Sequence, residues 1–388
     1  MAIFLIYGTD VDVKSVLTKG NFDQMIMEVE NLSKLSKVYV FTKDSSSYSD
    51  SFNRRAEHLF SKLFSLPDTT AGKLLQFAIF FLVGFVSIVR RLKEVEVVVS
   101  QGTTVLQGAV ANSLFHKPHI IFLHYFAYNE QFLLKRKFLP LFFRTIELFT
   151  LRHSTCVIVP NEKLKAAALA HGAKSVRIIP NFVEMKRINQ LDDRNILRKR
   201  LHFLNNHKVV LFVGRLHPVK NVDLLLRSFS CLDNLNECIL VIIGDGPEKK
   251  RLINLANSLS ISNRVFFEGF KPKKTVLEFM KASDVLVLPS LVEGQPRVVL
   301  EAWAAGLPVV ASKRPGLETL INDGIDGLLF DLGTDESLVE TMSIALNSEV
   351  ATKIASNAKK KVVDYDAAKV LSKQADIVKR FLPRIACT

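Results

Sequence analysis

The sequence predicts an α/β protein built from two doubly wound parallel sheets, and three observations lead to that prediction. The chain has 388 residues, too many for one ordinary domain and suited to two domains of roughly 150–200 residues. Hydrophobic residues make up 48% of it and charged residues 23%, which indicates a globular protein with a large core. The third observation is the alternation of short apolar runs with helical patterns.

The second half of the chain shows this alternation most clearly. Short apolar runs typical of buried strands recur at Val209–Val213, Leu240–Ile243, Val265–Phe267, Val285–Leu288 and Val309–Ala311. The helical patterns between them begin near Asn221, Pro247, Pro272 and Pro296. Strands that alternate with helices of this length favour a parallel sheet with helices on both faces.

The first half follows the same rhythm less regularly. Its predicted strands are Ile3–Tyr7, Val38–Thr42, Val95–Val99, Ile120–His124, Cys156–Val159 and Arg177–Ile179. The N-terminal run MAIFLIYG has no basic lead and is too short for a signal peptide, so we interpret it as the first buried strand. A helix is expected from about Asn21 to Leu35, and a last helix over Ala367–Phe381 that reaches back to the first half.

These patterns predict four parts of the chain. We expect an N-terminal Rossmann-like domain over residues 1–184 and a second Rossmann-like domain over 208–365. Between them, residues 185–207 are dense in charge and weak in apolar periodicity, which predicts a linker. Residues 366–388 are expected to form the C-terminal helix that packs on the first domain.

The charge of the chain points to an anionic partner. The net charge of +14 at pH 7 fits nucleic acid, an anionic membrane surface or phosphorylated substrates. Residues 1–185 hold 22 basic and 15 acidic residues, a net +7, which leaves +7 for the remainder. Because the excess is spread out and no zinc-finger or RNA-recognition signature is present, we expect no nucleic-acid partner. Four cysteines without CxxC or Cys/His pairing predict reduced thiols in an intracellular protein: Cys156, Cys231, Cys238 and Cys387.

The segment Leu291–Val310 holds the most informative pattern in the chain. Glu293 lies in a loop beyond a predicted strand, where open α/β sheets bind ligands. Pro296 suits the first position of the following helix, and Gly306 suits the residue just past its end. Glu301 would lie roughly 7.5 Å along that helix from its start.

Together these features fit an extended nucleotide-sugar. Backbone N–H groups near Arg297 and Val298 would point out of the helix start and form an anion site. One glutamate would then hold sugar hydroxyls and the other a ribose. Taken alone, two glutamates around a helix start are more often a solvated helix end, so this interpretation depends on the rest of the chain.

A second cluster supplies positive charge. Arg215 and Lys220 fall in the loop after the predicted strand Val209–Val213, beside a helix that Asn221 would cap. Two cations beside a helix start suit a diphosphate, which an arginine can bind through a bidentate fork. Gly214 would let the backbone turn tightly under a ligand. The plainer alternative is a surface loop with two solvated bases.

Weaker candidates lie at other strand ends. The turn in Ile242–Lys250 would shape the floor of a cleft, and the backbone around Phe270 could flank a base. Gly20 precedes a helix and permits close approach of a phosphate or sugar, although a simple turn is the more frequent explanation. His124 ends an apolar strand and would face a cleft; a histidine in such a place is more often structural.

Two apolar segments of the first half bear on membrane contact. The run Leu74–Val89 falls short of the roughly 20 residues that span a bilayer, and it is expected to be either a buried connecting helix or in contact with lipid. Phe132–Thr150 mixes basic residues with several phenylalanines, as interfacial helices at anionic membranes do. We expect attachment to an anionic membrane surface and no transmembrane span.

The motifs also resemble those of a known family. In order and spacing, GR…K, GDGP, EG and EGxPxVxLEAxAxGxPVVA are similar to the motifs of the retaining glycosyltransferase family 4, the group 1 glycosyltransferases. The resemblance covers nearly the whole chain. It is strongest from Pro180 to Phe330 and weaker before, where it rests on Lys19-Gly20, on His124 and on the turn at Pro180-Asn181.

This resemblance implies a fold and a set of roles. The fold would be GT-B, in which two Rossmann-like domains face each other across a cleft, with the donor in the second. Arg215 and Lys220 would bind the donor diphosphate, Glu293 the hydroxyls of the transferred sugar, and Glu301 the ribose. Further contacts with the donor or its sugar are implied for Gly20, His124, Gly214, Phe270, Gln295, Pro296, Arg297 and Val298.

The sequence departs from the family at Gln295, where phenylalanine is frequent, and Arg297 is a further variable position. The identity of the transferred hexose therefore stays open. Fixed cations and a helix start beside the leaving diphosphate would stabilise its charge without a metal. Asp10-Val11-Asp12 matches a metal-binding DxD pattern, but it directly follows the first strand, which is an unsuitable context. No GxGxxG dinucleotide fingerprint is present.

The expected function is a retaining transfer of a hexose or N-acetylhexosamine from a UDP- or GDP-sugar to a glycan or lipid-linked acceptor. The protein is expected to be cytoplasmic and peripheral at the inner membrane face, and to need no metal or cofactor. Two alternatives remain: a nucleotide-sugar epimerase with a GT-B fold, and a non-catalytic subunit or binding module that keeps the fold.

Overall fold

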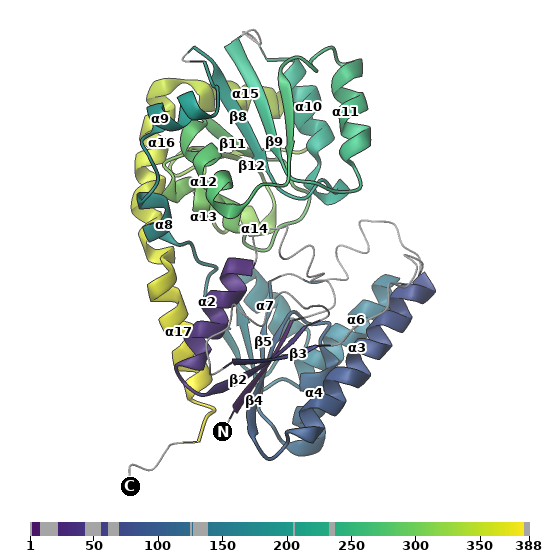
Figure 1. Ribbon diagram of the computed structural model, residues 1–388. Helices are drawn as coiled ribbons and strands as arrows, with labels where there is room; N and C mark the ends of the chain where they lie inside the picture. The colour runs from purple at the N-terminus through teal and green to yellow at the C-terminus, as the bar shows by residue number, and fades with distance from the viewer. Residues whose placement is uncertain are drawn as a thin grey trace. The chain divides into compact units, whose positions relative to one another are not determined.

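The computed structural model of the chain is shown in Figure 1, and it describes residues 2–7, 22–42, 56–60, 70–124, 126, 139–204, 206–232 and 237–383. Two compact units make up the chain. Residues Met1–Pro180 and Leu371–Thr388 form the first unit, and Asn181–Val370 form the second. The C-terminal helix α17 (Ala367–Lys379) therefore starts in the second unit and continues in the first. There the Nδ2 of Asn31 donates a hydrogen bond of 2.7 Å to the carbonyl of Leu371.

The first unit holds a parallel sheet of seven described strands in the order β3-β2-β1-β4-β5-β6-β7. Its strands are β1 (Ala2–Tyr7), β2 (Lys37–Thr42), β3 (Ala56–Phe60), β4 (Val95–Gln101), β5 (His119–Phe122), β6 (Cys156–Val159) and β7 (Val176–Ile178). Its helices are α2 (Phe22–Ser33), α3 (Thr70–Arg90), α4 (Leu106–Phe115), α6 (Leu139–Arg152) and α7 (Glu162–Ala170). The doubly wound order confirms the predicted fold class.

The second unit holds a parallel sheet of six described strands in the order β10-β9-β8-β11-β12-β13. Its strands are β8 (Lys208–Val213), β9 (Cys238–Ile243), β10 (Val265–Gly269), β11 (Val285–Leu288), β12 (Val309–Ser312) and β13 (Leu328–Phe330). Its helices are α8 (Met185–Asn189), α9 (Arg194–Arg200), η1 (Pro218–Lys220), α10 (Val222–Ser230), α11 (Lys249–Ser258), α12 (Lys273–Ala282), α13 (Arg297–Ala304), α14 (Pro315–Glu318), α15 (Asp335–Leu346), α16 (Ser348–Lys361) and η3 (Val362–Tyr365).

The central strands are buried because helices cover both faces of each sheet. All six residues of β9 and all four of β11 are buried, which explains why their sequences are continuous apolar runs instead of alternating ones. The two strands that the sequence analysis did not predict, β3 and β13, lie at the edges of their sheets. Only one residue of the three-residue β13 is buried, so its apolar pattern was too short to indicate a strand.

The segment predicted as a linker, residues 185–207, contains α8 and α9 and belongs to the second unit. Its charges are not simply solvated. The guanidinium of Arg198 is buried at 6% exposure and donates to the carbonyls of Ala282, Leu204 and His207. It also contacts the carboxylate of Asp284. The dense charge of this segment therefore belongs in part to the helix α9, which its ion pairs help to hold in place.

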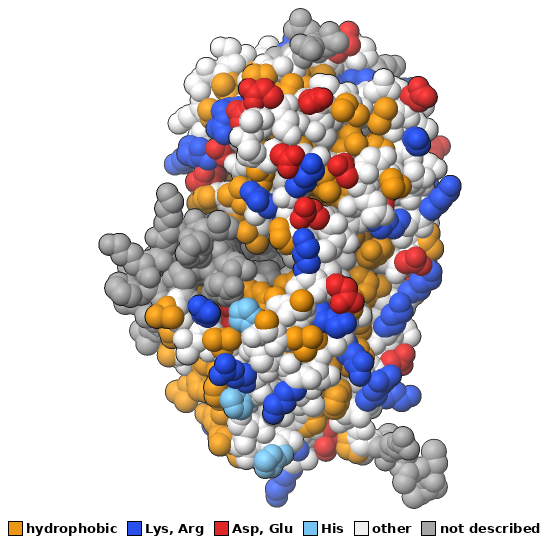
Figure 2. Space-filling view, turned by 180° about the vertical axis from the view of Figure 1, so that it is seen from behind, with side chains coloured by type: hydrophobic (Ala, Val, Ile, Leu, Met, Phe, Trp, Pro, Cys, Tyr) orange, Lys and Arg blue, Asp and Glu red, His pale blue; other side chains and the backbone are white. Residues whose placement is uncertain are grey.

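Helix α3 covers the predicted apolar run Leu74–Val89 and connects β3 to β4. Over the side chains described, residues 78–90, it is buried on one side, where Phe80 and Ile88 are 2% and 0% exposed, whereas Leu82 is 60% exposed. None of the described helices is both long and apolar enough to cross a membrane. Seen from behind, the molecule shows hydrophobic and basic side chains close together on its surface (Figure 2).

Candidate functional site

The candidate site of the second unit lies where its strand order reverses. The sheet runs outward from β8 in one direction and from β11 in the other, and β8 and β11 are paired neighbours. Ligands of open α/β sheets bind beyond the carboxyl ends of the strands at such a point. The loop after β8 carries Gly214, Arg215 and Lys220, and the loop after β11 carries Glu293 and Gln295. The sheet topology thus brings the two predicted clusters to one place.

The loop after β8 presents Arg215 to solvent. This residue is exposed, and its side chain forms no hydrogen bond or ion pair with any residue that the structure describes. Asn221 precedes α10, as predicted, but the prediction that its side chain caps the helix is wrong. The residue adopts a left-handed conformation with φ 53° and makes no side-chain capping bond. Its left-handed backbone lets the chain turn sharply from η1 into α10.

Lys220 and Glu293 form an ion pair across the switch point. The Nζ of Lys220 lies 2.5 Å from the Oε1 of Glu293, and the two side chains are 23% and 10% exposed. The sequence analysis assigns Lys220 to a diphosphate and Glu293 to a sugar. The structure places these groups in direct contact, so each fixes the position of the other.

Glu301 is paired with a residue that the sequence analysis missed. Its carboxylate forms an ion pair with Lys273, the first residue of α12, and the two side chains are 9% and 19% exposed. Burial lowers the pKa of Lys273 below its usual value, Glu301 opposes that shift, and Arg297 adds to it. A lysine in the first turn of a helix is unfavourable for the helix dipole. The position of Lys273 at the start of a predicted helix could therefore have indicated that a carboxylate lies nearby.

Gln295 contacts the segment where the chain enters the second unit. Its Oε1 accepts a hydrogen bond of 2.6 Å from the backbone N–H of Asn181, and its own carbonyl accepts one of 2.6 Å from the Asn181 Nδ2. Gln295 is 8% exposed. The side chain at this departure from the family pattern is therefore engaged within the protein and holds the loop after β11 in place.

Helix α13 begins one residue later than predicted. Pro296 is the N-cap residue with ψ 121°, and Arg297 is the first helical residue. The predicted end is confirmed, since Gly306 follows the C-cap with φ 74°. Val298 is half-buried. At the end of β10, Phe270 is 40% exposed, so part of its ring is available to a ligand.

Glycines let the loops at this edge approach one another closely. A Cβ on Gly244 would lie 1.8 Å from the carbonyl oxygen of Gly214, and one on Gly246 would lie 2.2 Å from that of Leu216. The backbone of Leu216 also donates a hydrogen bond of 2.9 Å to the carbonyl of Asp245. The GDGP turn therefore packs directly against the loop of Arg215; the cleft floor expected of Ile242–Lys250 stays a prediction.

Gly316 supports the loop after β11 in the same way, and it allows a test. A Cβ there would lie 2.1 Å from the carbonyl oxygen of Glu293 and 2.2 Å from that of Gly294. Gly316→Ala is expected to displace this loop. The affinity for the nucleotide-sugar expected at Glu293 should then fall by about tenfold or more, because small misplacements of a binding group are costly. Isothermal titration calorimetry measures this loss.

Gly333→Ala is the matched control, since a Cβ at Gly333 meets no atom within 4 Å. Its affinity should equal that of the unmodified protein. Equal affinities for Gly316→Ala and Gly333→Ala would show that the Glu293 loop does not hold the ligand.

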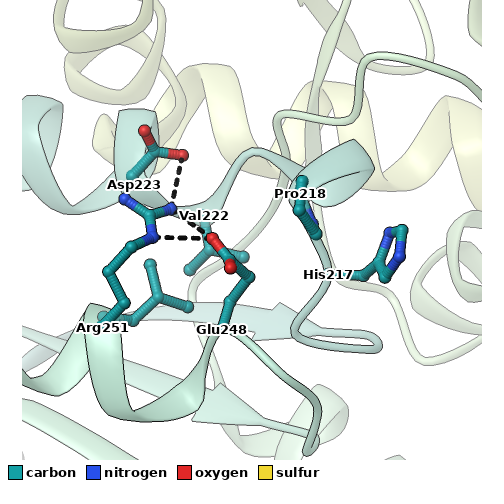
Figure 3. A pocket seen from close by; sticks show the side chains of 7 residues that line it. His217, Pro218, Val222, Asp223, Glu248 and Arg251 are labelled. Carbon is teal, nitrogen blue, oxygen red and sulfur yellow. Dashed lines mark hydrogen bonds and ion pairs between the residues drawn. The ribbon is translucent and has the colours of Figure 1, made fainter. Parts of the chain in front are cut away.

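A shallow depression lies on the second unit beside η1 and the starts of α10 and α11 (Figure 3). In it, Arg251 forms ion pairs with Glu248 at 2.5 Å and with Asp223 at 3.7 Å. Because its lining holds one cation and two carboxylates, the depression is not suited to an anionic ligand such as a diphosphate. It is lined by His217, Pro218, Val222, Asp223, Glu248, Arg251 and Leu252.

In the first unit, His124 lies two residues after the end of β5 and is half-buried. Its Nε2 lies 2.9 Å from the Oε1 of Gln101, the last residue of β4. Gly20 and the pattern Asp10-Val11-Asp12 lie outside the described residues. Within the described part of the chain, no group of three His, Cys, Asp or Glu side chains is placed to hold a metal ion.

Two family models match the chain. The model for "Glycosyl transferases group 1" matches residues 193–361, and the model for "Glycosyltransferase Family 4" matches residues 30–187. The two matches follow each other along the chain and fall mainly on the second and the first unit, respectively.

Comparisons with individual proteins agree. The chain is 26% identical over 284 residues to UDP-Gal:alpha-D-GlcNAc-diphosphoundecaprenol alpha-1,3-galactosyltransferase of Escherichia coli, covering 71% of this chain and 72% of that protein. It is 36% identical over 166 residues to D-inositol 3-phosphate glycosyltransferase of Acidothermus cellulolyticus, but this match spans only 37% of that relative and 40% of this chain. Sucrose-phosphate synthase of Thermosynechococcus elongatus has a similar fold, with a TM-score of 0.83, 17% identity, and coverage of 98% and 99% of the two chains.

Proposed function

The chain belongs to the group 1 (family 4) glycosyltransferases, and on that premise we propose that it transfers a sugar from a UDP or GDP donor to a glycan or lipid-linked acceptor. The transferred group is a hexose or an N-acetylhexosamine, and its anomeric configuration is retained. The relative from Escherichia coli supports a UDP donor and a diphosphate-linked lipid acceptor, since its name states both.

One observation carries this proposal: the ion pair between Lys220 and Glu293 at the switch point of the second sheet. It holds a cation and a carboxylate side by side, next to the exposed Arg215. The cations suit the donor diphosphate, and the carboxylate suits hydroxyls of the sugar attached to it. The buried Glu301, held by Lys273, suits the two hydroxyls of the nucleotide ribose.

The chemistry follows from the charge that develops in the reaction. When the bond between sugar and diphosphate breaks, negative charge builds on the leaving phosphate. Lys220, held in place by Glu293, and the exposed Arg215 stabilise that charge, together with the N–H groups at the start of α13. The leaving phosphate then helps to remove the proton of the acceptor hydroxyl on the same face of the sugar. We propose that no metal ion is needed; equal rates with EDTA and with Mg²⁺ would support this.

A nucleotide screen followed by product analysis tests the function. UDP or GDP is expected to raise the melting temperature of the protein, because a ligand of the folded state stabilises it, and the matching nucleotide-sugar should give free nucleotide and a glycosylated acceptor. A donor sugar converted without transfer would indicate the epimerase instead. Binding without release of nucleotide in the presence of glycan and lipid-linked acceptors would indicate the non-catalytic module.

We further propose that the first unit binds an anionic membrane surface, which would bring it to a lipid-linked acceptor. Helices α3, α4 and α6 pack together, and they expose the large apolar side chains Leu82, Val86, Val89, Leu114, Leu141 and Phe149. Exposed basic residues lie on or next to the same helices: Arg90, Lys93, Arg144 and Arg152. Apolar and basic side chains together suit the interface of an anionic bilayer. The basic triplet Lys135–Lys137 lies outside the described residues.

Negative charge introduced on this surface tests the membrane proposal. The double variant Leu82→Glu/Leu141→Glu is expected to lower binding to vesicles that contain phosphatidylglycerol by about tenfold or more, because it removes apolar contact and adds repulsion. Vesicle flotation measures the bound fraction. Ile325→Glu, at a 55% exposed position of the second unit, is the control and should bind like the unmodified protein. Failure of the unmodified protein to float with these vesicles would refute the membrane proposal.

A further inference from the structure

An ion pair joins two neighbouring helices of the second unit. Lys273 is the first residue of α12, and Glu301 lies in the middle of α13, the helix that follows the loop of Glu293. The two helices pack side by side (Figure 1). The Nζ of Lys273 contacts the Oε1 of Glu301, and the two side chains are 19% and 9% exposed. The pair is therefore largely removed from water.

Stability alone does not explain the lysine of this pair. Burial lowers the pKa of Lys273 below its usual value, although Glu301 opposes that shift, so the charged form is held at a cost. The place of Lys273 in the first turn of α12 is also unfavourable for the helix dipole. A buried ion pair is often no more stable than apolar side chains of similar size. Residues that break local rules in this way are expected at functional sites.

The carboxylate of Glu301 has acceptor capacity beyond this pair. Its two oxygens offer about four lone-pair positions, and within the described part of the chain Lys273 is the partner that its side chain contacts. Because a buried ammonium holds one oxygen, the position of the other is restricted too. A carboxylate held in this way can accept hydrogen bonds from two neighbouring hydroxyls, such as those of a ribose.

We propose that Lys273 is a positioning residue that holds Glu301 in the orientation that binds both ribose hydroxyls of the donor nucleotide, and that it thereby makes the site selective for ribonucleotides. This inference rests on the proposed function, which places the ribose at Glu301. Phe270, which is expected to flank the base, directly follows β10 and precedes Lys273 by three residues. One short loop between β10 and α12 then serves both the base and the ribose.

The proposal predicts a preference that a purely structural ion pair would not create. The unmodified protein is expected to bind UDP or GDP about tenfold or more tightly than the 2′,3′-dideoxy form of the same nucleotide, because hydrogen bonds to a charged group are strong. In Lys273→Met, the Kd of the ribonucleotide should rise about tenfold, whereas that of the dideoxy form should change by less than about threefold. Isothermal titration calorimetry measures each constant.

The kinetic effect should differ from that of changes at the diphosphate. The ribose does not react, so its contacts stabilise the bound donor and the transition state equally. Lys273→Met is therefore expected to raise the KM of the nucleotide-sugar about tenfold and to leave kcat within about threefold of the unmodified value. A fall in kcat without a change in KM would contradict the inference.

Two further variants complete the test. Lys274→Met removes the next lysine of α12, which is exposed, and should leave the ribose preference and KM unchanged. Lys273→Gln removes the charge but keeps a hydrogen-bond donor for Glu301, so the buried carboxylate stays partly satisfied. It should also lower the ribose preference, which keeps the proposal testable if Lys273→Met does not fold.

The outcomes separate this inference from the function on which it rests. An unchanged ribose preference in the folded Lys273 variants would overturn the inference even in an active transferase, and the ion pair would then only join α12 to α13. Equal binding of the ribonucleotide and its dideoxy form by the unmodified protein would overturn it as well. A ribose preference that depends on Lys273, in a protein that transfers no sugar to any acceptor, would uphold the inference and overturn the proposed function.

Discussion

Arg215→Ala is expected to lower kcat for sugar transfer by about a hundred- to a thousandfold, the usual loss when one fixed donor to a developing negative charge is removed. Lys220 is already paired with Glu293, whereas Arg215 is exposed and forms no ion pair with a described residue. Arg215 is therefore the cation most available to the leaving diphosphate. Single-turnover rates with saturating donor and acceptor measure this effect separately from binding.

Lys353→Ala is the control for charge, because Lys353 is an exposed cation on α16 of the same unit. Its kcat should match that of the unmodified protein. If Arg215→Ala and Glu293→Ala both transferred sugar at the unmodified rate, the cluster at the switch point would not be the donor site. The function would then need another site on the chain.

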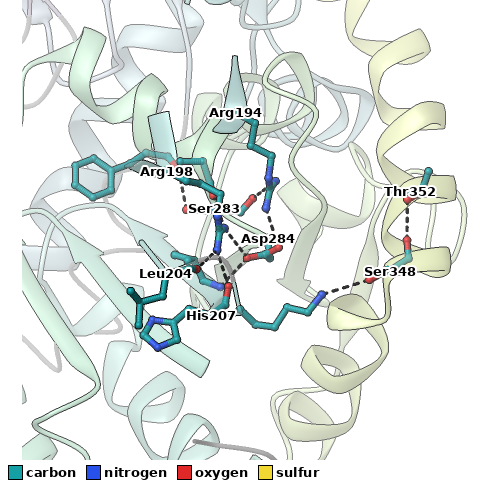
Figure 4. A network of polar contacts seen from close by, with 12 residues as sticks. Arg194, Arg198, Leu204, His207, Ser283, Asp284, Ser348 and Thr352 are labelled. Carbon is teal, nitrogen blue, oxygen red and sulfur yellow. Dashed lines mark hydrogen bonds and ion pairs between the residues drawn. The ribbon is translucent and has the colours of Figure 1, made fainter. Parts of the chain in front are cut away.

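Asp284→Ala is expected to destabilise the second unit by about 3–5 kcal/mol, because it leaves the buried guanidinium of Arg198 without its counter-charge. The carboxylate of Asp284 accepts from the Val209 N–H at 2.7 Å, from Arg194 at 2.8 Å and from Arg198 at 3.3 Å. Figure 4 shows these groups converging from α9 and the start of the sheet. A loss of this size is a large part of the 5–15 kcal/mol that stabilises a typical domain.

The single tryptophan of the chain makes this measurement specific. Trp303 is fully buried in the second unit, so its fluorescence in urea reports the unfolding of that unit alone. Asp192→Ala is the matched control, since Asp192 is 51% exposed and also pairs with an arginine of α9, Arg200, at 2.7 Å. That change should cost at most about 1 kcal/mol. Equal stabilities of the two variants would mean that α9 is not held by this network.

Most of the fold was predictable because its signals are local. Strands such as Cys156–Val159 and Val285–Leu288 are buried along their whole length, and a continuous apolar run records that burial directly. The edge strands β3 and β13 were missed because neither gives a long, continuous apolar run. The helices α8 and α9 were missed because both are short and bury few apolar side chains: Ile188 in α8, and Leu197 beside the buried Arg198 in α9.

The sequence by itself determined the α/β class, the doubly wound type of both halves, the positions of Arg215, Lys220 and Glu293 after strands, and that of Glu301 in the following helix. Periodicity, turn residues and family motifs are all properties of short segments, so they can be recognised without coordinates. They place each residue in its own helix or loop. They do not state which ends meet.

Only the tertiary structure decided the partners of these residues. Lys220 meets Glu293 from 73 positions away, and Asn181 meets Gln295 from 114 positions away. Glu301 meets Lys273, and Gln101 links His124 to Glu28. The Lys220–Glu293 contact arises because β8 and β11 are neighbours and the carboxyl ends of parallel strands lie at one edge of a sheet. Which strands are neighbours depends on the folding of the whole unit, and no local pattern records it.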